Sequence, residues 1–207
     1  MKKIISSIIF IICGVVLTII IVLAFKKHEV SNIDTGNDIT KYNLTNPSMV
    51  YYSDFDKVEN YLADSKEYEI LYIGRASCPY CLNYAPIINE IMYSKNKPFI
   101  YYSTENIKDT IESNGVVKNN PIHDKVVNWI IDNSKDAILN EYVKYKVVEG
   151  AENGKLLRLY TPRFFLIKDG KIIDCFMPKT ASNVKGDTNE EKLIIKTAFN
   201  NFIDGKI

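Results

Sequence analysis

The chain opens with a long, continuous apolar run. Residues 4–25 carry no charged side chain over 22 positions, and a helix of that length crosses a hydrocarbon core of about 30 Å. This pattern predicts an N-terminal transmembrane helix, kept as an uncleaved anchor over residues 1–27. The alternative is a cleaved signal peptide, because Val22 and Ala24 fit a small-residue cleavage site, but the apolar stretch of such peptides usually covers only about 7–15 residues.

The charges around the anchor give its predicted orientation. Two lysines flank the apolar run on each side, and only the N-terminal amine adds charge to the inner side. Removing Lys2, Lys3, Lys26 and Lys27 from the total of +1 leaves −3 for residues 28–207. An excess of Lys over Arg, with many Ile, Asn and Tyr, suggests an AT-rich bacterial genome. We therefore expect a single-pass protein of a bacterial cell membrane with its domain on the extracytoplasmic face.

After the anchor the pattern changes from continuous to periodic. Residues 28–47 are polar and lack periodicity, which predicts a tether that ends at Pro47. Residues 48–207 form the predicted domain. Its first helix is expected to be capped by Ser53 and to run to Leu62. The next expected elements are a buried strand at 68–73, a helix at 79–93 and a strand at 98–103.

The second half of the domain begins with a stretch that looks helical. Helical spacing recurs between residues 104 and 148, with Pro121 placed as a first-turn residue, so we expect a helical insertion there. The apolar runs at 163–167 and 171–176 flank Lys168-Asp169-Gly170, which predicts a β-hairpin.

The last element is a helix with a recognisable start. Thr188 and Glu191 form a capping box, and Gly205 is placed to end the helix. The whole order predicts an α/β domain in which helices flank a mixed sheet.

Composition narrows the function classes. With 46% hydrophobic residues and a net charge of +1, the chain is an ordinary globular protein without the basic field that nucleic acid binding needs. Four cysteines in 207 residues are too few for a disulfide-stapled scaffold. Two of them, Cys78 and Cys81, form a C-x-x-C motif.

This motif stands where a strand gives way to a helix. Pro79 suits the first helical turn, so Cys78 is expected at the helix N-terminus, where free N–H groups and the helix dipole stabilise a thiolate. Cys81 lies three residues on, on the same face and within disulfide reach. We predict that Cys78 is the attacking thiol and that Cys81 resolves the mixed disulfide.

Two structural interpretations of the motif compete with this one. A zinc site would need two more ligands, and His28, His123 and Cys175 are not closely spaced, so we expect no metal. A permanently closed disulfide across so short a loop would add little stability.

The residues around the motif resemble the thioredoxin-like family. Pro86 stands five residues after Cys81, and Thr161-Pro162 enters the predicted hairpin. The resemblance covers about residues 65–104 and 142–204. It implies a thioredoxin-like fold with the helical insertion before the cis-proline strand. It also implies that Pro162 is cis and that Thr161, Pro162, Pro79 and Tyr80 bind a substrate peptide.

The sequence also departs from that family. A buried Asp usually stands six residues before the first cysteine, and here Tyr72 occupies that position. Cys-Pro-Tyr-Cys is similar to glutaredoxin, but the glycine pair and Asp that bind glutathione are absent from residues 171–182. An anchor joined to such a domain is similar to the accessory thioredoxin-like proteins of bacteriocin maturation in Gram-positive bacteria.

We therefore expect a membrane-anchored enzyme that forms, reduces or isomerises disulfides in cysteine-containing polypeptides, without a cofactor and with an unidentified redox partner. The alternatives are a redox-inert peptide-binding module and a metal-handling protein that uses the cysteines as soft ligands. Three further residues are expected to be structural: Cys175 and Trp129 in the core, and His123 exposed to solvent.

Overall fold

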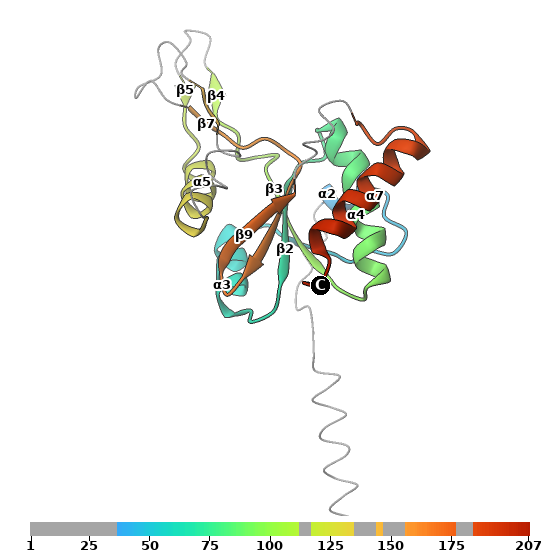
Figure 1. Cartoon of the computed structure of the whole chain (residues 1–207). Coiled ribbons are helices and arrows are strands. Elements are labelled where there is room, and N and C mark those ends of the chain that lie inside the picture. The colour runs from blue at the N-terminus through green and yellow to red at the C-terminus, as the bar shows by residue number, and fades with distance from the viewer. Residues whose placement is uncertain (1–36, 112–116, 135–143, 147–155, 177–183) are drawn as a thin grey trace, which may run out of the picture. The chain divides into compact units, whose positions relative to one another are not determined.

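The computed structural model describes residues 37–111, 117–134, 144–146, 156–176 and 184–207 (Figure 1). The predicted anchor, residues 1–27, lies outside this part of the chain. Among the described residues no helix is both long enough and apolar enough to cross a membrane.

A five-stranded mixed sheet forms the centre of the domain. Its spatial order is β1-β3-β2-β8-β9. Strands β1, β3 and β2 run parallel, whereas β8 is antiparallel to β2 and β9 is antiparallel to β8. The bounds are β1 Met49–Tyr52, β2 Glu69–Gly74, β3 Phe99–Ser103, β8 Arg163–Lys168 and β9 Lys171–Phe176.

α2 precedes these strands, and the other helices come between or after them. Their bounds are α2 Asn37–Thr40, α3 Phe55–Asp64, α4 Pro79–Ser94, α5 Pro121–Asn133 and α7 Asn189–Ile203. Two small ladders accompany them, β4 (Thr110–Ile111) with β5 (Val117–Lys118) and β6 (Lys144–Lys146) with β7 (Leu156–Arg158).

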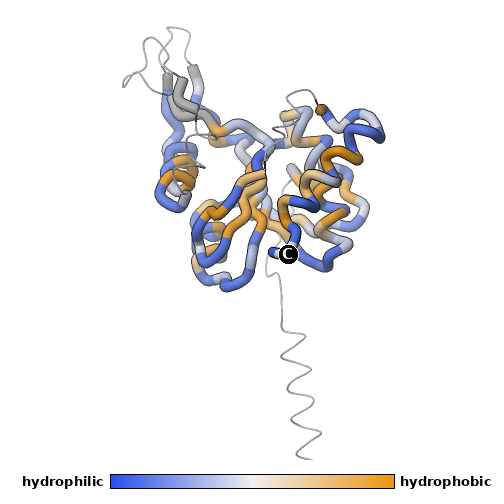
Figure 2. Tube along the Cα trace, in the orientation of Figure 1, coloured by the Kyte–Doolittle hydropathy of each residue, from blue (hydrophilic) through white to orange (hydrophobic). Residues whose placement is uncertain are grey.

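Alternation along β2 divides the core into two layers. Ile70 and Tyr72 point to the face covered by α4 and α7, and Leu71 and Ile73 point to the face covered by α3 and α5. All four side chains are fully buried, as expected of a parallel strand with helices on both faces. Figure 2 shows the resulting concentration of apolar positions along the strands and the inner sides of α4 and α7.

Two predicted caps have different outcomes. Thr188 and Glu191 do form a capping box at the start of α7. The prediction that Ser53 caps the first helix is wrong, because Asp54 is the N-cap and its carboxylate accepts the Asp56 N–H at 2.9 Å. Both residue types suit this position, and the extended backbone of Asp54 decides between them.

The helical insertion at residues 104–148 is only partly correct. α5 lies there, but so do β4, β5 and β6. β6 pairs with β7, which lies beyond the predicted insertion, and a pairing of this range leaves no mark on local hydrophobic spacing. Residues 135–143, within a further predicted helical segment, are outside the described residues.

The predicted tether also ends earlier than Pro47. Residues 37–40 form α2, and Tyr42 is only 2% exposed within the core beside α4. Asn89 of α4 fixes the following residues, since its side chain accepts the Ser48 N–H and donates to the Asn46 carbonyl, both at 2.8 Å. A single buried tyrosine in a polar stretch creates no periodicity, so the pattern alone could not reveal it.

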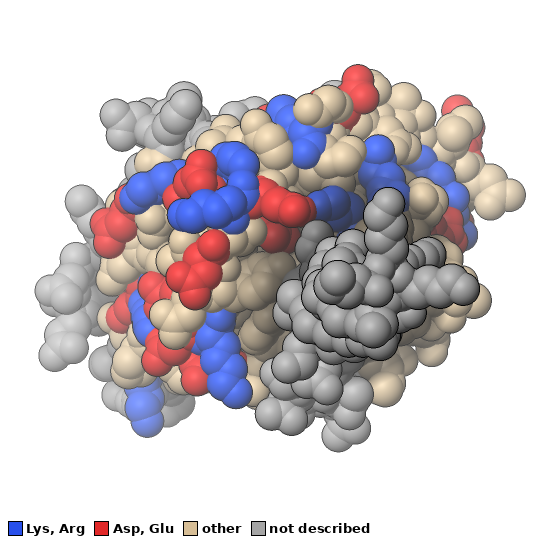
Figure 3. Space-filling model, turned by 90° about the horizontal axis from the view of Figure 1, so that it is seen from below, with Lys and Arg blue, Asp and Glu red and all other residues tan. Residues whose placement is uncertain are grey.

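Basic and acidic side chains are mixed on the surface that Figure 3 shows. That face agrees with the nearly neutral composition of the chain.

Candidate active site

The two cysteines of the C-x-x-C motif lie at the junction of β2 and α4. Cys78 is the N-cap of α4, with an extended backbone and no side-chain cap of its own, and Pro79 occupies the first turn. The Cys78 N–H donates to the Arg75 carbonyl at 3.2 Å, which closes the turn between strand and helix. Cys81 follows in the first turn of the helix, so both sulfurs belong to the positive end of the helix dipole.

A second chain segment reaches the same place. The Thr161-Pro162 peptide bond is cis, as the resemblance implies, and it immediately precedes β8. The Cys78 sulfur lies 3.5 Å from the Thr161 carbonyl oxygen, within hydrogen-bonding distance when Cys78 is protonated, across 83 positions of sequence. The structure thus brings Cys78, Cys81, Thr161 and Pro162 together.

The other two predicted contact residues lie at the edge of this arrangement. Pro79 is exposed, whereas Tyr80 is half-buried and packs against the core layer beside α4.

The two thiols differ in their electrostatics. Both are buried, with Cys78 8% exposed and Cys81 fully covered. Hydrogen bonding to the Cys81 thiol, supported by the Cys81 and Tyr80 backbone N–H groups and only partly opposed by burial, lowers the pKa of Cys78 to about 5. Cys78 is therefore a thiolate at neutral pH, which is the nucleophilic form.

Cys81 is shifted in the opposite direction. Burial, followed by the neighbouring Cys78, raises the pKa of the Cys81 thiol far above its usual range. Hydrogen bonds from the Tyr72 hydroxyl and the Arg75 backbone partly offset that rise. Cys81 thus stays protonated beside the Cys78 thiolate.

Tyr72 is held against Cys81 by tight packing. Its ring is stacked on Phe164 with centroids 4.5 Å apart and on Tyr101 at 5.0 Å. Its hydroxyl oxygen lies 3.0 Å from that of Tyr42, which in turn lies 3.2 Å from the Tyr101 hydroxyl oxygen. Burial, with smaller contributions from Cys81 and Tyr42, raises the pKa of Tyr72 well above its usual value, so Tyr72 remains a neutral donor.

Gly74 makes room for this phenol. A Cβ atom at Gly74 would lie 2.1 Å from the Tyr72 oxygen. The two positions lie on the same side of β2, two residues apart. Only glycine at position 74 leaves the phenol in this place.

Polar residues from the segment after β3 border the site. Glu105 accepts the Ser77 N–H at 3.1 Å, and Lys108 pairs with Glu105 at 3.3 Å. Partial burial would raise the pKa of Glu105, but the bonds from Ser77 and Lys108 outweigh it and lower that pKa. The residue before Cys78 is therefore fixed by a carboxylate.

The residues expected to be structural have mixed outcomes. Cys175 is 5% exposed, and burial raises its pKa to about 12; Trp129 is 9% exposed and packs on Phe55. The prediction that His123 is exposed is wrong. It is 7% exposed, because its ring faces Asp109, a partner from a distant segment that the sequence around position 123 does not reveal.

Sequence reasoning missed two contributors to the site. Tyr42 belongs to the segment interpreted as a tether, and Glu105 is one of many acidic residues. A signal for Tyr42 would have been an aromatic residue isolated in an otherwise polar stretch; no local signal marks Glu105.

The sheet is mixed, helices cover both of its faces, and the cis-proline strand lies opposite the cysteines, as the resemblance stated for the sequence implies. No protein-family model matches the chain, and no curated protein matches it. Among solved structures it is similar to a thioredoxin of Nicotiana alata, at 11% identity and a TM-score of 0.39. That match covers 64% of this chain and 84% of the other.

Proposed function

We propose that the protein is a thiol–disulfide oxidoreductase acting on cysteine-containing polypeptides. One observation carries this proposal: a Cys78 thiolate, with a pKa of about 5, lies beside a buried Cys81 thiol and the cis Pro162. A thiolate that is stable at neutral pH next to a protonated partner is what two-step disulfide exchange requires.

In the reducing direction, the Cys78 thiolate attacks one sulfur of a substrate disulfide. The bond between Cys78 and that sulfur forms as the substrate bond breaks, and the other substrate sulfur leaves as a thiolate. Cys81 then gives its proton to the substrate thiolate released in the first step and attacks the Cys78 sulfur. This attack releases the second substrate thiolate and leaves a Cys78–Cys81 disulfide. Two electrons pass to the substrate, and the reverse sequence oxidises a dithiol.

Tyr72 would assist the second step. Its neutral hydroxyl donates to the Cys81 sulfur and so favours the negative charge that develops there. The backbone of Thr161 and the ring of Pro162, with Pro79 and Tyr80 at the edge, would hold the substrate peptide beside Cys78.

Stabilisation of the Cys78 thiolate favours the reduced form of the protein, which makes its disulfide oxidising. We expect a reduction potential between about −230 and −170 mV, above the value of about −270 mV that is typical of thioredoxin. A redox titration against glutathione measures it, and a value near that of thioredoxin would instead indicate a dedicated reductant.

Trapping tests the proposed exchange directly. In full-length protein purified in detergent, Cys81→Ser should accumulate mixed disulfides with polypeptides through Cys78, whereas the matched Cys175→Ser variant should not. Insulin reduction provides the activity assay. A reduced wild-type protein with intact thiols and no insulin reduction would favour a redox-inert binding module and contradict the proposal.

We further propose that residues 1–27 anchor this domain to the outer face of a bacterial membrane, on the strength of the uncharged run at 4–25. A membrane-impermeant thiol reagent should then label Cys78 in intact cells from which the wall has been removed. Labelling only after lysis would place the domain in the cytoplasm.

A further inference from the structure

A second cluster of polar side chains lies where the segment after β3 meets the first turn of α5. It comprises Asp109, His123 and Asp124. Nδ1 of His123 lies 3.5 Å from Oδ2 of Asp109 and 3.9 Å from Oδ1 of Asp124. The ligand atoms of the three residues are all within 4.8 Å of one another.

The cluster is buried but incompletely paired. His123 is 7% exposed, and its Nδ1 is a buried atom without a hydrogen-bond partner. The Asp109 side chain is 8% exposed; its Oδ1 accepts the Asn120 N–H at 2.7 Å, which leaves Oδ2 directed at His123. A buried polar atom without a hydrogen-bond partner is destabilising, so Nδ1 of His123 needs a further partner.

The surrounding charges do not provide that partner. Among the described residues, no ion pair joins a Lys or Arg to Asp109 or Asp124; the nearby Lys125 pairs with Asp56 and Glu59 instead. Two carboxylates and one imidazole therefore face one another with an excess of negative charge.

We propose that Asp109, His123 and Asp124 bind a divalent transition-metal ion of the Zn²⁺ class. Zinc takes His nitrogen and Asp oxygen ligands at about 2.0–2.2 Å, so two ligand atoms of a tetrahedral site lie about 3.3 Å apart. The separations from Nδ1 are 3.5 and 3.9 Å, and all three ligand atoms lie within 4.8 Å of one another, so the side chains must close by up to about 1.5 Å to reach this geometry. The half-exposed side of Asp124 leaves a fourth position open to water.

The imidazole decides between metal classes. Mg²⁺ and Ca²⁺ prefer sites made entirely of oxygen ligands, whereas a nitrogen ligand suits zinc and its neighbours in the first transition row. The proposed ligands come from α5 and from the segment before β4, so this metal site is separate from the two cysteines.

The position of the site gives the ion a structural consequence. Asp109 belongs to the same segment as Glu105 and Lys108, which contact Ser77 beside Cys78. An ion shared by Asp109 and α5 would fasten this segment to the helix and so steady one border of the cysteine site.

Calorimetric titration with Zn²⁺ tests the proposal. The full-length protein is used in its oxidised form, so that Cys78 and Cys81 cannot bind the metal as thiolates. His123→Ala should weaken Zn²⁺ binding by about 100-fold. Loss of a residue that only orients a metal ligand already weakens binding about 10–100-fold, and His123 would itself be a ligand. His28→Ala is the matched control, since the chain has two histidines, and should leave binding unchanged.

Two further measurements separate loss of the metal ligands from misfolding of the variant and from metal binding by cysteine. Asp124 is 45% exposed, so Asp124→Asn should preserve the fold and still weaken binding. Bound Co²⁺ should show a visible spectrum without a sulfur-to-metal charge-transfer band. Three outcomes would overturn the proposal: no Zn²⁺ binding by the wild type, equal Zn²⁺ binding by His123→Ala and the wild type, or a sulfur-to-cobalt charge-transfer band in the wild type and in His123→Ala. None of these outcomes bears on disulfide exchange.

Discussion

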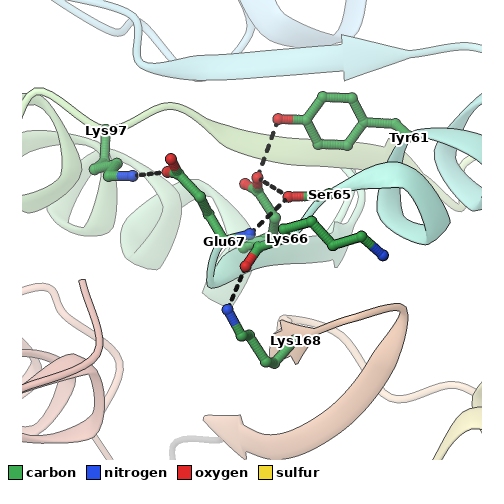
Figure 4. A network of polar contacts seen from close by, with 7 residues as sticks. Tyr61, Ser65, Lys66, Glu67, Lys97 and Lys168 are labelled. Carbon is green, nitrogen blue, oxygen red and sulfur yellow. Dashed lines mark hydrogen bonds and ion pairs between the residues drawn. The ribbon is translucent and has the colours of Figure 1, made fainter.

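The polar groups at the two ends of β2 differ in their exposure to water. At its carboxyl end, two buried thiols and the Tyr72 hydroxyl share hydrogen bonds out of contact with water. At its amino end, Glu67 pairs with Lys97, their side chains 59% and 40% exposed, and Lys168 donates to the Lys66 carbonyl (Figure 4).

The difference shows that hydrogen bonding inside a buried site, rather than formal charge, gives a group unusual chemistry. The amino end carries full charges, yet water screens exposed ion pairs to about 0–1 kcal/mol. The carboxyl end has thiols and hydroxyls, and there the pKa of Cys78 falls to about 5. A few hydrogen bonds in a dry site therefore matter more than several surface ion pairs.

The largest effect that tests this contrast is loss of activity. Cys78→Ser should abolish insulin reduction, because serine at the start of α4 supplies no thiolate. Cys175→Ser should retain near-normal activity, since Cys175 lies in the other core layer. Equal loss in both variants would mean that the first effect is structural.

The next largest effect is the contrast between thiols in labelling. Because the pKa of Cys78 is lowered to about 5, its alkylation rate should rise with pH to a midpoint near 5 and then level off. The pKa of Cys175 is raised to about 12, so at pH 7 only about 1 in 100,000 of its molecules is a thiolate. Mass spectrometry of reduced protein should find label on Cys78 first; faster labelling of Cys81 or Cys175 would reverse the assigned roles.

Crowding beside Tyr72 should have an effect on stability. Gly74→Ala puts a methyl group 2.1 Å from the Tyr72 oxygen, and overpacking of this kind costs about 1–3 kcal/mol. Urea unfolding of the reduced protein measures it. The double variant Gly74→Ala with Tyr72→Leu removes the ring, whose oxygen and nearest carbons would lie 2.1–2.5 Å from that methyl group, and should recover part of the loss; additive effects would contradict the proposed contact.

Removing the Tyr72 hydroxyl alone should mainly affect chemistry. Hydrogen bonds to charged groups contribute about 1.5–3 kcal/mol, so Tyr72→Phe should slow resolution of the mixed disulfide about 10-fold or more and shift its pH profile upward. Tyr101→Phe, which removes a hydroxyl that bonds Tyr42 rather than Cys81, is the control. An unchanged pH profile in Tyr72→Phe would remove Tyr72 from the second step.

The smallest effect belongs to the amino end of β2. Lys97→Ala should change the free energy of unfolding by less than about 1 kcal/mol, because its pair with Glu67 is exposed. Activity should stay as in wild type. A loss comparable to that of Gly74→Ala would show that the two ends do not differ in the way described.

The parts of this comparison that sequence could predict are local ones. Cys78, Pro79 and Cys81 at a strand-to-helix junction, and the Thr188 capping box, are encoded within a few residues. The cis Pro162 came from a family resemblance rather than from physics.

What sequence could not predict depends on distant partners. Tyr42 is buried because its hydroxyl forms hydrogen bonds with those of Tyr72 and Tyr101. His123 is buried because Asp109, from another segment, lies against its ring. The strands within residues 104–148 escaped notice for the same reason, since β6 finds its partner only at β7. Hydrophobic periodicity indicates which face of a helix or strand is buried. It does not indicate which residue of another segment packs against that face.

The burial of Tyr42 also limits how far the domain could extend from the proposed anchor. Under the proposed anchoring, a free leash from residue 28 to residue 47 could extend about 70 Å from the membrane, but the chain is already part of the domain at α2. In the sequence only nine positions, 28–36, then separate the proposed anchor from α2, and nine residues span at most about 30 Å. Substrates would then be met close to the lipid surface, where newly exported polypeptides emerge, rather than in the wider volume outside the cell.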